Sequence, residues 1–335
     1  MSRRGAPAGG AWPRAGGAMS RRAWLAFASM AAIWGVPYLF IKVALTGGIP
    51  PLTLAWARVA LGAAVLLGLA RRAGTLGSVR GHGRWLLAYA VAEVSVPFPL
   101  IAAGEQRVAS SLAAILISAV PLIGALLALR FDPSERPTPI RALGLLVGFG
   151  GVVALMGVDV AGRHGELIGA LAILLAAVGY AIGPMLVKHR LAALDARAAM
   201  GASLAIAAVL LTPLAALDLP RRAPSAGAAV AVLVLGLLCT ATAFVIFTVL
   251  IAEAGTSRAT VITYINPVVA VTLGVILLGE RPGAGAIAGL LLILVGSWLA
   301  TDGRTPPGLL RLTALSGVPA RLPKRLSERR APTRS

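Results

Sequence analysis

The chain has 335 residues, of which 58% are hydrophobic and only 13% are charged. A soluble domain carries about 25% charged residues, so this composition excludes an ordinary soluble protein. Lysine and arginine total 31 against 12 acidic residues, which gives a formal net charge of +19. An excess of this kind is typical of nucleic-acid-binding proteins and of cytoplasmic loops in membrane proteins, and the mean hydropathy of +0.87 favours the second class, with no nucleic-acid partner.

The two ends of the chain are poor in apolar runs. Residues 1–22 are rich in Gly, Ala and Arg, and residues 302–335 are rich in Arg and Pro, so both predict disordered basic tails. The string MSRR occurs at residues 1–4 and again at 19–22, which leaves open which methionine begins the protein. The apolar run that follows is too long for a typical signal peptide, and we interpret it as a retained membrane helix.

Between these tails lie ten apolar runs of about the 20 residues that a helix needs to cross a bilayer. Gly- and Pro-rich segments separate the runs, and the runs lack the alternation of β-barrel strands. They predict an all-α integral membrane protein with ten transmembrane helices, at residues 23–45, 52–70, 85–103, 108–129, 140–157, 167–187, 196–217, 226–252, 258–279 and 284–301.

The distribution of basic residues predicts the orientation. If the N-terminus is cytoplasmic, ten spans place 24 of the 31 Lys and Arg residues inside and 5 outside. Because cytoplasmic loops are enriched in Lys and Arg, we expect a multi-pass protein of the cytoplasmic membrane with both termini in the cytoplasm.

The two halves of the chain, 23–157 and 158–301, resemble one another. A Glu-Arg-Pro triplet at 135–137 recurs 145 residues later, as do two glycines, Gly144 as Gly289 and Gly151 as Gly296. Five spans per half is an odd number, so the second half is expected to be inverted relative to the first. Inverted repeats are typical of secondary transporters, whose binding site lies between the repeats near the middle of the membrane.

Residues 23–301 resemble the EamA type of the drug/metabolite transporter superfamily. The motifs that carry the resemblance are Ile33-Trp34-Gly35, the stretch 110–121, the stretch 134–151 and its second-half counterpart over 256–296; Gly179-Tyr180 replaces the Trp-Gly pair in the second half. The resemblance implies two inverted five-helix repeats around a central cavity, and movement of small metabolites across the cytoplasmic membrane.

Ionisable side chains inside the predicted spans are the first candidates for function, because charge in a bilayer is costly. Glu93 lies deepest, and either exchanges a proton, binds a substrate amine, or is a hydrogen-bonded structural carboxyl. Arg58 either pairs with Glu93 or a substrate carboxylate, or extends its guanidinium to the outer interface. Lys42, near the outer end of the first span, is more simply interpreted as reaching that interface.

Polar residues near two prolines form a second candidate group. A proline inside a helix removes a backbone hydrogen bond, so Pro121 and Pro267 predict kinks in the fourth and ninth spans. Ser118 accompanies the first kink, and Tyr264 and Asn266 accompany the second, where they can either bind substrate or only shape the packing.

Three aromatic side chains, Trp34, Tyr38 and Tyr180, are candidates for lining the cavity, with core packing or interface anchoring as the alternative. Glycine patterns predict close helix packing rather than chemistry. They are Gly144-x-x-x-Gly148 and Gly285-x-x-x-Gly289.

We expect a secondary transporter, and not an enzyme, for a small organic metabolite that is amino-acid-like or drug-like, with efflux as the expected direction. His82, His164 and His189 all fall in loops, the lone Cys239 gives no multi-cysteine site, and no Walker-type phosphate loop is present, so no catalytic residue, metal or cofactor is expected. A membrane-embedded enzyme or a channel is the alternative. The expected partners are the substrate and the bilayer; import, the coupling ion and a homodimer stay open.

Overall fold

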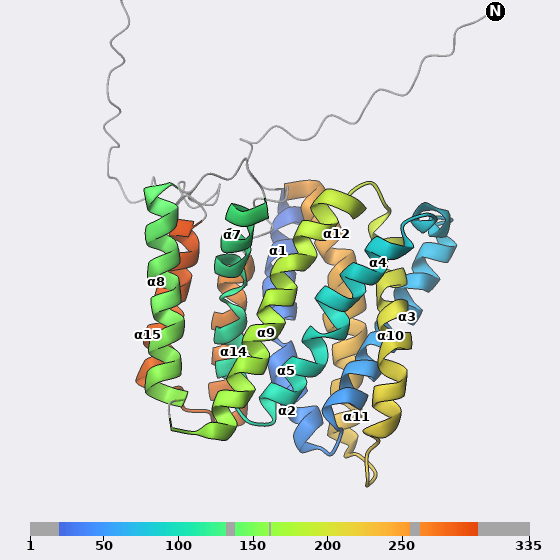
Figure 1. Cartoon of the computed structure of the whole chain (residues 1–335). Coiled ribbons are helices and arrows are strands. Elements are labelled where there is room, and N and C mark those ends of the chain that lie inside the picture. Colours follow the sequence, from blue (N-terminus) through green and yellow to red (C-terminus); the bar gives the residue numbers. More distant parts are fainter. Residues whose placement is uncertain (1–19, 132–137, 161, 255–261, 301–335) are drawn as a thin grey trace, which may run out of the picture.

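The computed structural model describes residues 20–131, 138–160, 162–254 and 262–300, and the regular structure in this part of the chain is helical (Figure 1). Eight helical runs have the length and hydropathy to cross a membrane, and two further apolar helices have 17 residues each. Each of the ten predicted spans is therefore helical over most of the residues that the structure describes in it. The tails up to residue 19 and from 301, the triplet 135–137 and residues 256–261 lie outside the described residues.

The first half of the chain contains five helical runs, some of them interrupted. Prolines stand in the first turn of several helices, where the missing backbone N–H leaves no hydrogen bond unmade. The elements are α1 (Arg21–Gly35), α2 (Pro37–Thr46), α3 (Pro51–Arg72), η1 (Leu76–Val79), α4 (Gly83–Tyr89), η2 (Ala90–Ser95), α5 (Pro97–Glu105), α6 (Ser110–Ile117), α7 (Val120–Phe131), α8 (Pro139–Leu155) and η3 (Met156–Val160).

The second half repeats this pattern. Side chains of Asp195 and Ser225 cap two of its helices by accepting hydrogen bonds from backbone N–H groups of the first turn. The elements are α9 (His164–Leu186), η4 (Val187–Leu191), α10 (Ala196–Leu217), α11 (Ala226–Leu233), η5 (Val234–Thr242), α12 (Ala243–Ala254), α14 (Ile262–Leu278) and α15 (Ala284–Ala300).

Of the segments labelled η, η1 is a 3-10 helix and η2, η3, η4 and η5 are π-helical. Two of the π-helical segments, η2 and η5, interrupt corresponding spans. The 145-residue offset of the sequence repeat carries η2 onto residues 235–240, which lie inside η5. A π-turn widens the helix locally and is frequent at functional sites. The third and eighth spans therefore share a local distortion at the same place.

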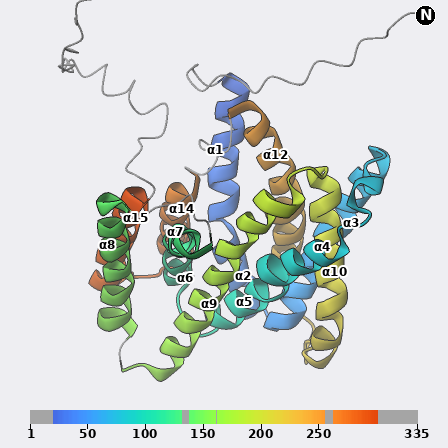
Figure 2. The ribbon, with the colours of Figure 1, turned by 45° about the horizontal axis from the view of Figure 1, so that its top comes forward.

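The halves of the chain interleave in the bundle. The pair α8 and α15 lies at one edge and the pair α3 and α10 at the opposite edge, in both views (Figures 1 and 2). Between these edges α5 packs on α9, α2 on α11, α1 on α12 and α6 on α14. Each of these pairs joins one half to the other, so neither half has a core of its own. We call the end where α1 begins the upper end and the end where α2 ends the lower end.

The contact between α8 and α15 is a glycine seam, formed by Gly144, Gly148 and Gly151 of α8 with Gly289 and Gly296 of α15. A Cβ built on Gly144 would lie 2.7 Å from the Gly296 carbonyl oxygen, and one on Gly296 would lie 2.6 Å from the Gly144 oxygen. Gly151 and Gly289 repeat this relation at 2.9 Å in both directions. The two helices are therefore antiparallel, and the close packing that the glycine patterns predict is confirmed.

Candidate functional site

Arg58 lies inside the bundle rather than at its surface, with 9% of its area exposed. Its Nε donates a hydrogen bond to Oγ1 of Thr240 in η5 at 3.0 Å. Its guanidinium carbon lies 4.1 Å from the ring centroid of Phe98 in α5, a cation–π geometry. The positive charge is thus held where α3, α5 and η5 meet, by residues from both halves of the chain.

Glu93 belongs to η2, in the middle of the third span. Its carboxylate faces α9 at Gly183, where a Cβ would overlap the Glu93 Oε2 and Cδ atoms. Oε2 is buried and accepts no hydrogen bond from the described residues. Glycine at position 183 therefore provides the space that this carboxylate occupies, and the oxygen lacks the donor that a buried carboxylate normally has.

Two tyrosines lie within electrostatic range of these charges. Tyr180 of α9 interacts electrostatically with both Arg58 and Glu93. Tyr38 of α2 interacts with Tyr180 and Arg58, and both tyrosines are half-buried. We call Tyr38, Arg58, Glu93 and Tyr180 the central polar group. Four of the residues singled out from sequence are thus brought together from four different spans.

Lys42 does not extend away from the bundle. Its Nζ donates to the backbone oxygens of Glu105, at 2.6 Å, and Val108, at 2.9 Å. The Glu105 carbonyl is at the C-terminal end of α5, where a cation is favoured by the helix dipole, and Val108 lies in the segment that follows. Lys42 therefore fixes the lower end of α5 to α2.

Glu105 is the last residue of α5, and sequence reasoning missed it. Its exposed fraction is 0%, and neither carboxylate oxygen has a hydrogen-bond partner among the described residues. The expected third span ended at residue 103 and so left Glu105 in a loop. A signal was present, because Glu105 continues the buried stripe of Val94, Phe98 and Ile101 at helical spacing.

Contacts between the two halves connect the loops of the lower end. The Glu280 carboxylate accepts hydrogen bonds from the backbone N–H groups of Ser110, at 2.7 Å, and Ser111, at 2.9 Å, at the start of α6. Burial alone would raise the pKa of Glu280, but the hydrogen bonds from Ser111 and Ser110 outweigh it and hold that pKa below its ordinary value. Similar contacts join Asp159 to Ala286 N, Asp218 to Leu52 N, and Gly47 O to Ser225 N.

The upper end has a further contact between the halves. Asp195 caps α10 and accepts a hydrogen bond from Thr75 of the first half at 3.2 Å. The Arg197 side chain, 3.0 Å away, is the main cause of a lowered pKa at Asp195.

Several other predicted site residues have local structural partners. Trp34 packs against Phe247 and Phe244 of α12, with ring centroids 4.8 and 6.4 Å apart. In the orientation that satisfies its surroundings, the Asn266 amide nitrogen donates to the Ala31 oxygen at 3.2 Å and to the oxygen one turn earlier in α14. Both side chains therefore contribute to contacts of α1.

The two predicted kinks differ. Ser118 donates its hydroxyl proton to the Ile115 oxygen at 2.5 Å and ends α6, and Pro121 stands in the first turn of α7. Pro267 instead lies within α14, which continues through it, and Tyr264 is half-buried in the first turn of that helix. The fourth span is thus broken and the described part of the ninth is continuous.

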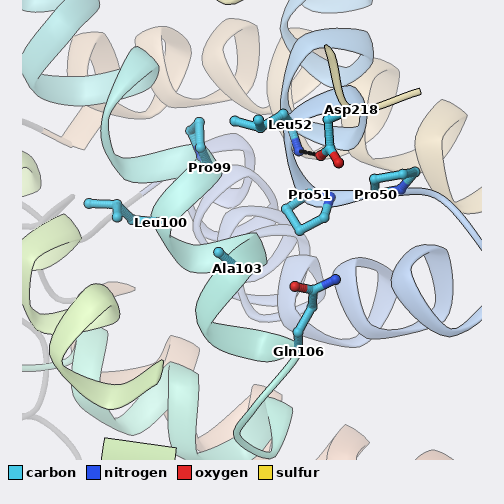
Figure 3. A pocket seen from close by; sticks show the side chains of 8 residues that line it. All are labelled: Pro50, Pro51, Leu52, Pro99, Leu100, Ala103, Gln106 and Asp218. Carbon is cyan, nitrogen blue, oxygen red and sulfur yellow. Dashed lines mark hydrogen bonds between the residues drawn. The ribbon is translucent and has the colours of Figure 1, made fainter. Parts of the chain in front are cut away.

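A surface pocket of about 440 Å³ lies at the lower end, where α3 begins and α5 ends (Figure 3). It is lined by Pro50, Pro51, Leu52, Pro99, Leu100, Ala103, Gln106 and Asp218. Figure 3 shows the Asp218 carboxylate directed at the backbone of Leu52, and the Gln106 amide at the rim. None of the residues predicted from sequence to bind substrate lines this pocket.

Comparison with known proteins gives three results. A profile of the EamA-like transporter family matches residues 21–157 and again residues 167–301. Sixteen chains of solved structures match; one of them, a crystal structure, aligns with 84% of this chain and 97% of its own at 23% identity and a TM-score of 0.61, which shows a shared fold. No protein of curated function matches.

Proposed function

Since this chain belongs to the EamA-like transporter family, whose members are multi-pass membrane transporters, we propose that it is a secondary transporter. Its substrate is a small organic metabolite, amino-acid-like or drug-like, and the proposed direction is efflux. The chain carries it by alternating access between two inverted halves.

The observation that carries the proposal is the central polar group. Arg58 and Glu93 are opposite charges on different helices, and no ion pair joins them within the part of the chain that the structure describes. Tyr180 interacts with both. A zwitterionic amino-acid-like substrate offers a carboxylate for the guanidinium and an amine for the carboxylate, and its binding would supply an opposite charge to each of them.

The packing supports a cycle of alternating access. The reciprocal contacts of the glycine seam, Gly144 with Gly296 and Gly289 with Gly151, are what a two-fold axis between inverted repeats requires. Contacts of Glu280, Asp218 and Asp159 with the opposite half connect the lower end. Such contacts can break and re-form as one half rocks against the other around a fixed site.

The substrate test begins with untargeted profiling of metabolites in cells and medium, with and without the protein. We expect zwitterionic compounds to move from cells to medium when the protein is present, and a shift in the opposite sense would reverse the proposed direction. Flux of the identified compound in proteoliposomes should fall about 100-fold or more in Glu93→Gln, because a buried charge–charge contact to the substrate is lost.

Glu166→Gln is the matched control, since Glu166 is a surface carboxylate that pairs with Arg163 at 3.1 Å. It should transport as the unaltered protein does. Transport by Glu93→Gln at the control rate would remove Glu93 from the site, and chemical conversion of a bound metabolite by the purified protein would favour an enzyme.

The proposed orientation has its own test. Reporter domains fused at residue 80, at the upper end, and at residue 222, at the lower end, are expected on the cytoplasmic and outer sides of the membrane respectively. Reporters on the same side would contradict the topology.

A further inference from the structure

Glu105 is a buried carboxyl group that the central polar group does not use. It is fully buried at the C-terminal end of α5, and no donor among the described residues reaches either of its oxygens. An ionised carboxylate without hydrogen bonds is costly to bury, and the carbonyl end of a helix disfavours negative charge further. A permanently ionised Glu105 carboxylate is therefore unfavourable at this position.

The charged groups around Glu105 oppose one another. Lys42, whose ammonium binds the backbone at the end of α5, favours the ionised form, and so does Arg58. Glu280 disfavours it. Tyr38 also interacts with Glu105, the backbone N–H groups of Ser110 and Ser111 in α6 bind Glu280, and α9 faces this end of α5 with Gly169 and Ile173.

The chemistry of the neighbours selects a proton over a metal ion. A bound Na⁺ or other hard cation needs several oxygen ligands. Two backbone oxygens at the end of α5 and just beyond it, those of Glu105 and Val108, already accept hydrogen bonds from Lys42, whose own charge repels a second cation. A proton requires only the carboxylate itself.

Glu105 also lies beside a contact between the halves. Glu280, with which it interacts, holds the start of α6 through Ser110 and Ser111. Loss of the negative charge on Glu105 removes a repulsion next to that contact, and its return restores the repulsion. The charge of Glu105 can therefore influence whether the lower end is closed.

We infer that the Glu105 carboxyl is a proton-binding site that is loaded and unloaded in the transport cycle, and so couples a proton to the movement of substrate. This inference rests on the proposed function for its role in a cycle. The site itself, a carboxyl that takes up and releases one proton, can be tested without any substrate.

The experiment is a pH titration of the full-length protein in liposomes, followed by infrared spectroscopy of the carboxyl C=O stretch, with the proton as the only ligand. We expect a titrating component that is lost in Glu105→Gln and kept in Glu93→Gln. In Glu105→Asp it should persist with a changed midpoint, which separates loss of the site from loss of folding. A Glu105→Gln spectrum identical to that of the unaltered protein would overturn the inference.

Lys42→Gln provides a second measurement. Glutamine can still donate a hydrogen bond to the end of α5, but the positive charge is gone, so the midpoint of the Glu105 component should rise by about one pH unit or more. An unchanged midpoint would contradict the proposed effect of the Lys42 charge on the Glu105 carboxyl.

Flux of the identified substrate completes the test. Acceleration by an imposed pH gradient should be lost in Glu105→Gln, while exchange without a gradient continues. If the infrared component is lost but no metabolite is transported, the proton site stands and the proposed function fails; if transport occurs and ignores both the gradient and Glu105, the inference fails alone.

Discussion

The glycine seam and the central polar group are two contacts between the same halves, and they have opposite character. In the seam, backbones of α8 and α15 touch without intervening side chains, so there is no room for movement or for a ligand. In the central polar group, Arg58 and Glu93 lie between helices without pairing with each other. We propose that the seam contributes to stability and that the central polar group contributes to transport.

The two halves also differ in charge at equivalent positions. The 145-residue offset carries Arg58 onto Ser203, Glu93 onto Leu238, and Glu105 onto Leu250. Intramembrane charge is thus confined to the first half among these pairs, and the second half contributes neutral partners such as Tyr180 and Thr240. The repeat therefore does not extend to these charges.

The largest effect is expected from filling the seam. In Gly144→Leu the new side chain would collide with the backbone of Gly296 and Ala300, which cannot move aside. We expect a loss of about 3 kcal/mol or more in the free energy of unfolding, measured by denaturant titration in detergent. Gly150→Leu on the same helix has open space around its Cβ and should cost far less; equal losses would contradict the seam.

Removing the positive charge of the central polar group should reduce transport rather than stability. Arg58→Gln removes the guanidinium that we propose to bind a substrate carboxylate, and we expect flux to fall at least about 30-fold. Arg58→Lys should recover only part of it, because lysine lacks the planar group that donates to Thr240 and stacks on Phe98. Transport in proteoliposomes, at matched protein density, checks both; full activity of Arg58→Gln would refute the assignment.

A smaller effect is expected at Glu280, a charged residue whose role is a structural contact between the halves. Glu280→Gln should weaken the attachment of α6 by about 1 kcal/mol, as for loss of a charged helix cap. Because the pKa of Glu280 is lowered, its stabilisation is complete at pH 7 and is lost only as pH falls through that lowered pKa. Thermal unfolding measured from pH 7 downward should show the two proteins converging in acid.

The smallest effect is expected at the upper end. Asp195→Asn keeps the cap on α10 but loses its ion pair with Arg197, which is exposed, so the change should be below about 1 kcal/mol. The lowered pKa of Asp195 means that this contribution is present at neutral pH and lost as pH falls below the usual aspartate range. Thermal unfolding at pH 7 measures it; a change as large as that of Gly144→Leu would contradict the ranking.

The sequence predicts the spans well because a bilayer imposes a length on an apolar helix. The expected seventh span, 196–217, coincides with α10, and the other described ends differ by four residues or fewer. The packing role of the glycine patterns is also predictable, because residues such as Gly144 and Gly289 have no side chain and so allow two helices to approach closely.

The candidate site is less predictable, because its geometry depends on contacts between distant residues. Nothing in the sequence around Thr240 or Phe98 indicates that both meet Arg58, since neither is charged. Glu105 was missed because a length of about 20 residues ended its span too early. Asn266 was predicted at a kink, either to bind substrate or to shape the packing, and the contact of its amide with the backbone of α1 could not be read from the sequence.

Cys239, the single cysteine of the chain, lies buried in η5 next to Thr240 and within electrostatic range of Arg58. The protein therefore carries one chemical reporter at the place where the two halves hold Arg58. A small thiol reagent that modifies Cys239 has reached the interior of the bundle, so the labelling rate measures how often that interior opens. Because the chain has no other thiol, the Cys239→Ser protein is the negative control for such labelling.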